Sequence, residues 1–137
     1  QSRGPQQGAA GPERGAATVL AWPLDWTRVG DPEALRQRAE AAGLPPPSLV
    51  LAADVAYDQE VLTPFLATLA RLRDGWLRAT APPRRAELLI GREHRGTGTG
   101  RALLMGLRAI GLRPRRLRCP AVEAEGRGQV ELLTAEL

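Results

Sequence analysis

The feature that most constrains the fold is an uninterrupted apolar run near the middle of the chain. Within residues 48–55, the stretch Leu-Val-Leu-Ala-Ala at 49–53 contains no polar side chain. A short run of this kind is typical of a strand that is buried on both faces of a parallel sheet. A helical pattern follows over residues 59–72, where apolar residues recur at spacings of one, three and four. Together the two segments predict a strand–helix unit of an α/β fold.

The alternation of strand and helix continues toward the C-terminus, and a weaker set of elements precedes it. Strand–helix–strand units of this size form parallel sheets whose crossover helices lie on the sheet faces. Ligands of such sheets bind beyond the carboxyl ends of the strands, which selects residues 54–58, residues 92–100 and, if the first predicted strand joins the sheet, Trp26 as candidate site segments. The further predicted elements are a strand at 18–22, a helix from an N-cap at Asp31 to a stop at Gly43, a strand at 86–91, a helix at 99–110, and strands at 113–119 and 129–137.

The first 17 residues differ in composition from the rest of the chain. They contain Gly, Gln, Pro and Arg without apolar periodicity, which predicts a disordered tail or an inserted loop at residues 1–17. Residues 18–137 hold every predicted element and are expected to form part of one domain. Gln1 stands where an initiator Met would be, which is compatible with processing and also with a fragment.

Cysteine use and hydropathy bear on the compartment. The single cysteine, Cys119, has no partner for an internal disulfide, which fits a reducing environment. The sequence has no apolar run long enough to span a bilayer and no secretory leader. We therefore expect an intracellular protein, cytoplasmic or nuclear, without a membrane partner.

The net charge of +4 comes from Arg alone, because the chain contains no Lys. The abundance of Ala, Gly, Pro and Arg indicates a compositional bias that affects the whole sequence. One cluster stands out, at Arg113, Arg115, Arg116 and Arg118, and on a strand Arg116 and Arg118 would share a face that can contact phosphate. Elsewhere the arginines are interleaved with acids. A solvated strand edge is therefore favoured over a nucleic-acid site.

Two polar side chains at the end of the central run are the first candidates for catalysis. Asp54 and Tyr57 follow the predicted strand and precede the helix. A carboxylate in this place can accept a hydrogen bond from an amine, and a phenol can orient or hold that amine. An equally consistent interpretation is that Asp54 caps a turn and Tyr57 packs its ring under the helix.

Four segments, in order, resemble the seven-β-strand methyltransferases grouped as methyltransferase family 16, which include many protein-lysine methyltransferases. Residues 49–58, Leu-Val-Leu-Ala-Ala-Asp-Val-Ala-Tyr-Asp, resemble the family's Asp-x-x-Tyr segment. Residues 24–26, Leu-Asp-Trp, resemble its Leu-x-Trp element. Residues 62–69 resemble its following helix, and residues 93–95, Glu-x-Arg, resemble its pattern after the next strand. The resemblance covers residues 19–137 and implies a Rossmann-like seven-stranded methyltransferase fold.

The resemblance also implies a cofactor and four site residues. The cofactor is S-adenosylmethionine and the substrate is a lysine side chain of another protein. Trp26 would lie against the adenine, although an ordinary packed Trp is the alternative. Ala53 would line the cofactor pocket, and Asp54 and Tyr57 would stand where the acceptor amine enters. The protein's task would be alignment of the amine, its deprotonation and the exclusion of water.

The sequence departs from the family in the part that holds the cofactor. Members bind the methionine portion through a Gly-rich turn after the first strand and the ribose through an acid that ends the second, and neither element is present. The resemblance therefore implies an incomplete fold, a fragment with impaired or no activity alone. Such a sheet would expose an edge and apolar surface. A chaperone or complex partner, or a role as a non-catalytic interaction fragment, would fit that surface.

A second resemblance competes with the first. Residues 95–100, Arg-Gly-Thr-Gly-Thr-Gly, fit Arg-x-x-Gly-x-Gly and resemble the acyl-CoA-binding turn of the GCN5-related N-acetyltransferases. There, backbone N–H groups that open a helix hold the pyrophosphate. That fold needs a strand meander before the turn, whereas the preceding residues predict strand–helix–strand, and its later Asn and aromatic residues are missing after Ile110. A flexible Gly/Thr loop before a helix accounts for the segment equally well, and the methyltransferase interpretation is favoured.

Overall fold

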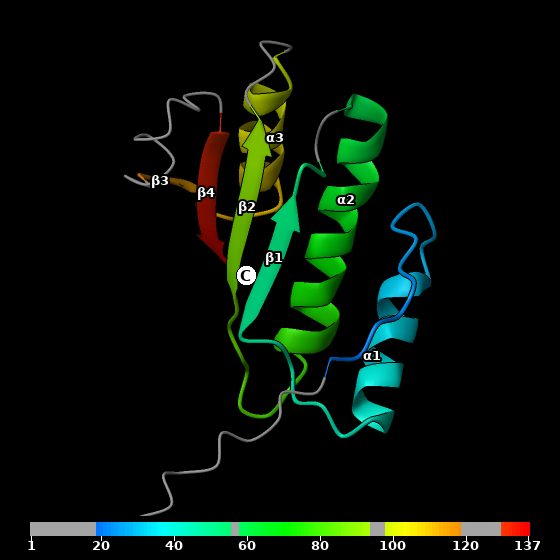
Figure 1. The fold of residues 1–137 in the computed structure, drawn as a ribbon. Helices are drawn as coiled ribbons and strands as arrows, with labels where there is room; N and C mark the ends of the chain where they lie inside the picture. The colour runs from blue at the N-terminus through cyan, green and yellow to red at the C-terminus, as the bar shows by residue number, and fades with distance from the viewer. Residues whose placement is uncertain (1–18, 56–57, 94–97, 119–129) are drawn as a thin grey trace, which may run out of the picture.

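The computed structural model describes residues 19–55, 58–93, 98–118 and 130–137. These residues form a mixed four-stranded sheet with helices packed on one of its faces (Figure 1). The helices are α1 (Asp31–Ala41), α2 (Gln59–Leu72) and α3 (Thr99–Ala109), with a π-helical turn, η1 (Arg73–Leu77), directly after α2. The strands are β1 (Leu49–Ala53), β2 (Glu87–Glu93), β3 (Arg115–Leu117) and β4 (Val130–Glu136).

The sheet has the strand order β1-β2-β4-β3. β1 and β2 are parallel and are joined through α2, so the predicted strand–helix–strand unit is confirmed. β4 runs antiparallel to both β2 and β3, which makes the sheet mixed. The chain is therefore an α/β protein at this level of description.

The core lies between the sheet and the pair α2 and α3. Alternate residues of β2 and β4 point into it, namely Leu88 and Ile90 from β2 and Leu133 and Ala135 from β4. They meet the apolar stripes predicted for the two helices, which supply Leu62, Phe65, Leu69, Leu103 and Leu107. α2 has the predicted bounds, and the side chain of Asp58 caps it by accepting a hydrogen bond from the Glu60 N–H at 3.1 Å.

The prediction that residues 48–55 form a strand buried on both faces is wrong in its second part. β1 is an edge strand, and Leu49 and Leu51 are 49% and 68% exposed. They lie on the sheet face opposite to α2 and α3, together with Leu89 of β2, which pairs with Leu51. An apolar run carries no information about which of its two faces a neighbouring element covers, so the sequence pattern missed this open face.

Two other predicted strands and one predicted helix cap differ from the structure. Residues 19–22 of the strand predicted at 18–22 form no strand, and Val19 is 87% exposed. Gly30, not Asp31, is the N-cap of α1, and the Asp31 carboxylate instead accepts a hydrogen bond from the Asp25 N–H at 3.0 Å. The strand predicted at 113–119 is reduced to β3 within the described residues. The predicted tail at 1–17 lies outside them.

Candidate functional site

Asp54 is the candidate residue with the most unusual backbone. It follows the last residue of β1, and its N–H donates a hydrogen bond to the Gly91 carbonyl of β2 at 2.9 Å. Its φ is +50°, in the left-handed region that residues other than Gly rarely adopt. Such residues persist where the surrounding structure over-determines them, and they cluster at active sites and ligand clamps. The side chain is exposed at the carboxyl ends of two parallel strands, the place that the sequence predicts for a ligand.

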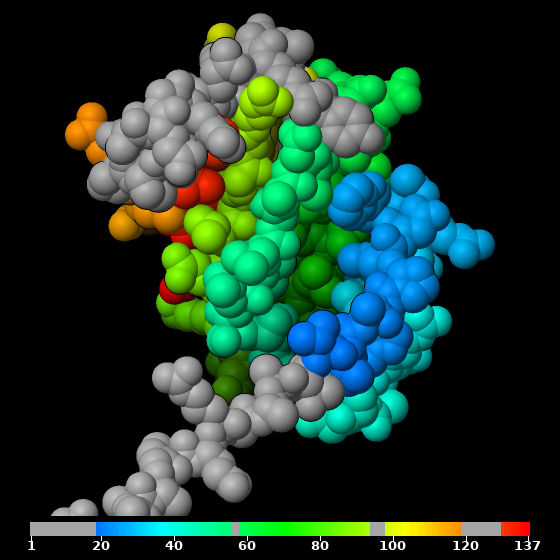
Figure 2. Space-filling view, in the orientation of Figure 1, coloured from blue at the N-terminus to red at the C-terminus, as the bar shows by residue number. Residues whose placement is uncertain are grey.

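Ala53 lies immediately before this outlier, on the open face of the sheet. It pairs with Gly91, and both have little or no side chain, so the backbone at this end of β1 and β2 is accessible. Figure 2 shows a hollow between β1, in teal, and the blue segment that carries Trp26, with α2 at its base. The free edge of β1 forms one wall of that hollow.

Trp26 packs on α2. Its ring contacts that of Phe65 in an edge-to-face arrangement, with centroids 5.9 Å apart and an interplanar angle of 76°. The side chain is half-buried against the core cluster. The packing role considered for Trp26 is therefore confirmed, and its proposed contact with an adenine stays a prediction.

Hydrogen bonds fix the turn that carries Trp26. The Asp25 carboxylate accepts hydrogen bonds from the Thr27 hydroxyl at 2.6 Å and from the Thr27 N–H at 2.9 Å. These bonds favour the ionised form and lower the pKa of Asp25 below its ordinary value. The Asp25 N–H in turn binds the Asp31 carboxylate. Both the backbone N–H and the carboxylate of Asp25, the middle residue of the Leu-Asp-Trp segment, are therefore hydrogen-bonded. The neighbouring indole of Trp26 packs toward α2.

Two of the sequence-based candidates lie outside the described residues: Tyr57 and Arg95. Glu93 is described, and it is exposed at the end of β2, opposite Val130 of β4. The fold therefore brings Ala53, Asp54 and Glu93 to the same end of the sheet, at the carboxyl ends of β1 and β2. Because residues 19–22 form no strand, the strand-end rule does not place Trp26 at this site.

An ion cluster that no sequence pattern predicts lies on the core side of β2 and β4. Arg92 is 8% exposed, and both its Nε and its Nη2 lie 2.6 Å from Oε2 of Glu131 on β4. The Nε of Arg116 contacts the other oxygen of Glu131. Two guanidinium groups therefore share one carboxylate, and Arg116, which was considered for phosphate contact, is already engaged. The partners are far apart in sequence, so only the strand register reveals them.

The Gly-rich segment considered for acyl-CoA has a structural explanation in its described part. Gly98 precedes α3 with a φ of +71°, a conformation that favours Gly. At Gly100 a Cβ would overlap the Arg92 guanidinium, so a larger residue there would have to displace one member of the buried ion pair. The confirmed β1–α2–β2 order before this turn also differs from the strand meander that an acetyltransferase needs. The acetyltransferase interpretation therefore gains no support from the described residues.

The described ranges contain neither a metal-binding cluster nor a membrane-spanning helix. Within those ranges, no group of three or more His, Cys, Asp or Glu side chains is placed to hold a metal ion. None of the helices there has the length and apolar content that crossing a bilayer requires.

Comparison with known proteins assigns no family to the chain. No family model matches its sequence. No curated protein matches it either. The residue patterns and the geometry of the site are therefore what bears on the function of the chain.

Proposed function

We propose that this chain carries the acceptor side of an S-adenosylmethionine-dependent protein-lysine N-methyltransferase. The observation that supports the proposal most is the position of Asp54, an exposed carboxylate on a left-handed residue beyond the carboxyl end of β1. An outlier of this kind fixes the direction in which a side chain points. It lies in the segment that resembles the Asp-x-x-Tyr element of methyltransferase family 16.

In the proposed reaction Asp54 positions the acceptor. Its carboxylate accepts an N–H hydrogen bond from the lysine amine and so holds the nitrogen lone pair in one direction. S-adenosylmethionine, when bound, supplies a methyl group that is activated by the positive sulfur. Alignment at a site that excludes water is the main contribution of the protein to such a transfer. The neutral amine nitrogen bonds to the methyl carbon as the carbon–sulfur bond breaks and the sulfur leaves as a neutral thioether, and the product ammonium loses its proton to solvent after the transfer.

The described residues fit part of this cofactor. The half-buried indole of Trp26 offers a flat apolar surface beside the hollow, and Ala53 leaves room next to the edge of β1. The described residues before β1 include no strand with a Gly-rich turn, so they provide no holder for the methionine portion. We therefore expect the chain by itself to bind the cofactor weakly or not at all.

The sheet is compatible with the C-terminal half of a seven-stranded methyltransferase sheet. β1 and β2 are parallel and joined through a helix, as in a Rossmann-like sheet, and β4 adds an antiparallel strand beside β2. Parallel strands normally have helices on both faces. The free edge of β1 and the exposed Leu49 and Leu51 offer the surface on which further strands and a second helix layer would pack.

Calorimetric titration with S-adenosylmethionine tests the proposal. The proteins compared are this chain and the longest translation product that contains it. We expect binding by the longer product only, weakened about fivefold to a hundredfold by Trp26→Ala, as for the loss of a stacking aromatic. Trp22→Ala is the matched control, because Trp22 is half-buried in the same segment, and it should leave the affinity unchanged. Failure of the folded longer product to bind would contradict the proposal.

A further inference from the structure

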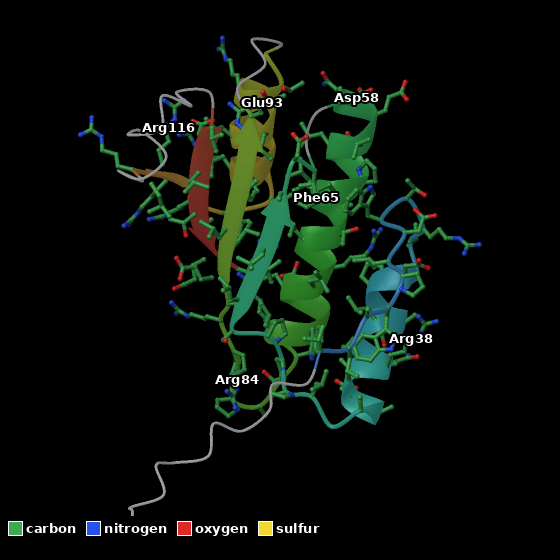
Figure 3. The ribbon with its side chains drawn as sticks, viewed as in Figure 1. Arg38, Asp58, Phe65, Arg84, Glu93 and Arg116 are labelled. Atoms are coloured by element: carbon green, nitrogen blue, oxygen red, sulfur yellow. The ribbon has the colours of Figure 1, made fainter. Side chains whose placement is uncertain are left out.

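A groove lined by arginine side chains lies at the opposite end of the sheet from Asp54. It encloses about 1070 Å³ between the connector into β2, the residues after α3 and the end of β4. Figure 3 shows Arg84 at this end of the molecule, whereas Asp58 and Glu93 lie at the other end. The groove is therefore separate from the candidate methyltransferase site. Its arginines are Arg73, Arg78, Arg84, Arg85, Arg113 and Arg115.

Three of the six arginines already have acidic partners. Arg73 and Arg78 both bind the carboxylate of Asp74, at 2.8 and 3.1 Å. Arg85 binds Glu136 at 2.7 Å. Two carboxylates thus balance two of these three positive charges, so the three guanidinium groups contribute less to the attraction of a ligand than their number suggests.

The other three arginines give the groove its excess of positive charge. Arg84, Arg113 and Arg115 are exposed, and none forms an ion pair with any residue in the described ranges. The remaining acid in the lining, Glu87, accepts a hydrogen bond from the Thr134 hydroxyl at 2.9 Å. Three guanidinium groups thus line one side of the groove without a carboxylate partner among the described residues.

The lining of the groove is not charged throughout. Four buried apolar residues form part of it, with exposed fractions of 2 to 7%. They are Ala86, Leu112, Ala135 and Leu137. The groove therefore combines a cationic rim with an apolar base.

We infer that this groove binds an acidic polypeptide segment of a partner protein. Guanidinium forks match carboxylates in geometry, and Arg84, Arg113 and Arg115 can each take one, while an apolar side chain of the same segment contacts the base. The described residues of the lining include no aromatic side chain, so the base stacking by which proteins bind single-stranded nucleic acid is not offered. The inference does not depend on the methyltransferase proposal.

Fluorescence anisotropy on the whole chain tests the inference. The probe is a short labelled peptide of Glu and Asp with Leu at every fourth position. A labelled single-stranded RNA of equal charge is measured in parallel as the alternative ligand. The groove variant changes Arg84, Arg113 and Arg115 to Gln. A matched variant changes Arg71, Arg101 and Arg108 to Gln, three exposed arginines outside the groove. Circular dichroism verifies that both variants fold, and the single change Arg84→Glu serves if the groove variant does not.

The expected result is that the peptide binds at low salt, that the groove variant binds it about tenfold more weakly or worse, and that the matched variant stays within about twofold. An equal loss in both variants would show attraction by net charge alone and would overturn the inference. So would the absence of peptide binding at low salt. Tighter binding of the RNA, lost in the groove variant, would assign the groove to nucleic acid instead.

Discussion

The Arg92 guanidinium lies directly against Gly100, where any Cβ would overlap it. Arg92 extends from β2 on the core side of the sheet, and Gly100 is in the first turn of α3. The contact lets the helix begin above a buried arginine that is paired with Glu131. The packing of Arg92 therefore explains a glycine that resembles part of a phosphate-binding turn.

Gly100→Ala should destabilise the protein. The added methyl group must displace the Arg92 guanidinium from Glu131, and over-packing of this kind costs about 1–3 kcal/mol. The free energy of unfolding from urea titration measures it. Gly75→Ala is the control, because nothing lies within 4 Å of the site of its Cβ, and it should be neutral or slightly stabilising. An unchanged stability of the Gly100 variant would contradict the contact.

Glu131→Gln should be more harmful than the same change at Glu136, on the same strand. Loss of the Glu131 charge leaves Arg92 buried without an ionic partner, and breaking a buried pair costs about 3–5 kcal/mol. Glu136 pairs with Arg85 at the exposed surface, where such a pair contributes about 0–1 kcal/mol. Thermal unfolding of the two variants at one pH compares them. Equal effects would mean that the Arg92–Glu131 pair is not buried as described.

The open face of the sheet predicts a contrast between two leucines on neighbouring strands. Leu88 is fully buried, and Leu88→Ala should cost about 2–5 kcal/mol. Leu51 is 68% exposed, and Leu51→Ala should change the free energy of unfolding by about 0.5 kcal/mol or less. Chemical denaturation distinguishes the two. A large loss at Leu51 would indicate that this face is covered in solution.

The lowered pKa of the Asp74 carboxyl predicts that the stability of the fold depends on pH. Its hydrogen bond with Arg73 is the main reason that the pKa of its carboxyl is lowered in the folded state. A depressed folded pKa contributes stability that is present above the ordinary value of 3.8 and is lost as the pH falls below it. Asp74→Asn should therefore lower Tm near neutral pH, and the difference from wild type should shrink in acid. A difference that stays constant with pH would exclude this linkage.

The local pattern of the sequence predicts α2, α3 and the position of β2 well. The apolar spacing of the two helices determines which side of each faces the core. Residues 59–72 form α2 as predicted, since its stripe and the capping Asp58 agree. The environment of β1 was predicted incorrectly, because a run that is apolar on both sides cannot show that the sheet ends there. The ion cluster at Glu131 and the groove containing Arg84 and Arg113 depend on contacts between distant segments, which no local pattern contains.

The candidate site was predictable to the same extent. The end of an apolar strand locates Asp54, and Asp adopts the left-handed region more readily than most residues, but no apolar pattern shows that it does so here. The packing of Trp26 on Phe65 depends on how the segment before α1 returns to α2.

Transfer of tritium from methyl-labelled S-adenosylmethionine to protein lysines tests the central claim most directly. The enzyme is the longest translation product that contains these residues, and mass spectrometry identifies the modified side chain. Asp58→Asn is the matched control, because Asp58 is exposed four residues farther on and Asn also caps helices well. We predict transfer by the wild type and by Asp58→Asn, and its loss in a folded Asp54→Asn variant. No transfer by the wild type, or equal transfer by Asp54→Asn, would contradict the account.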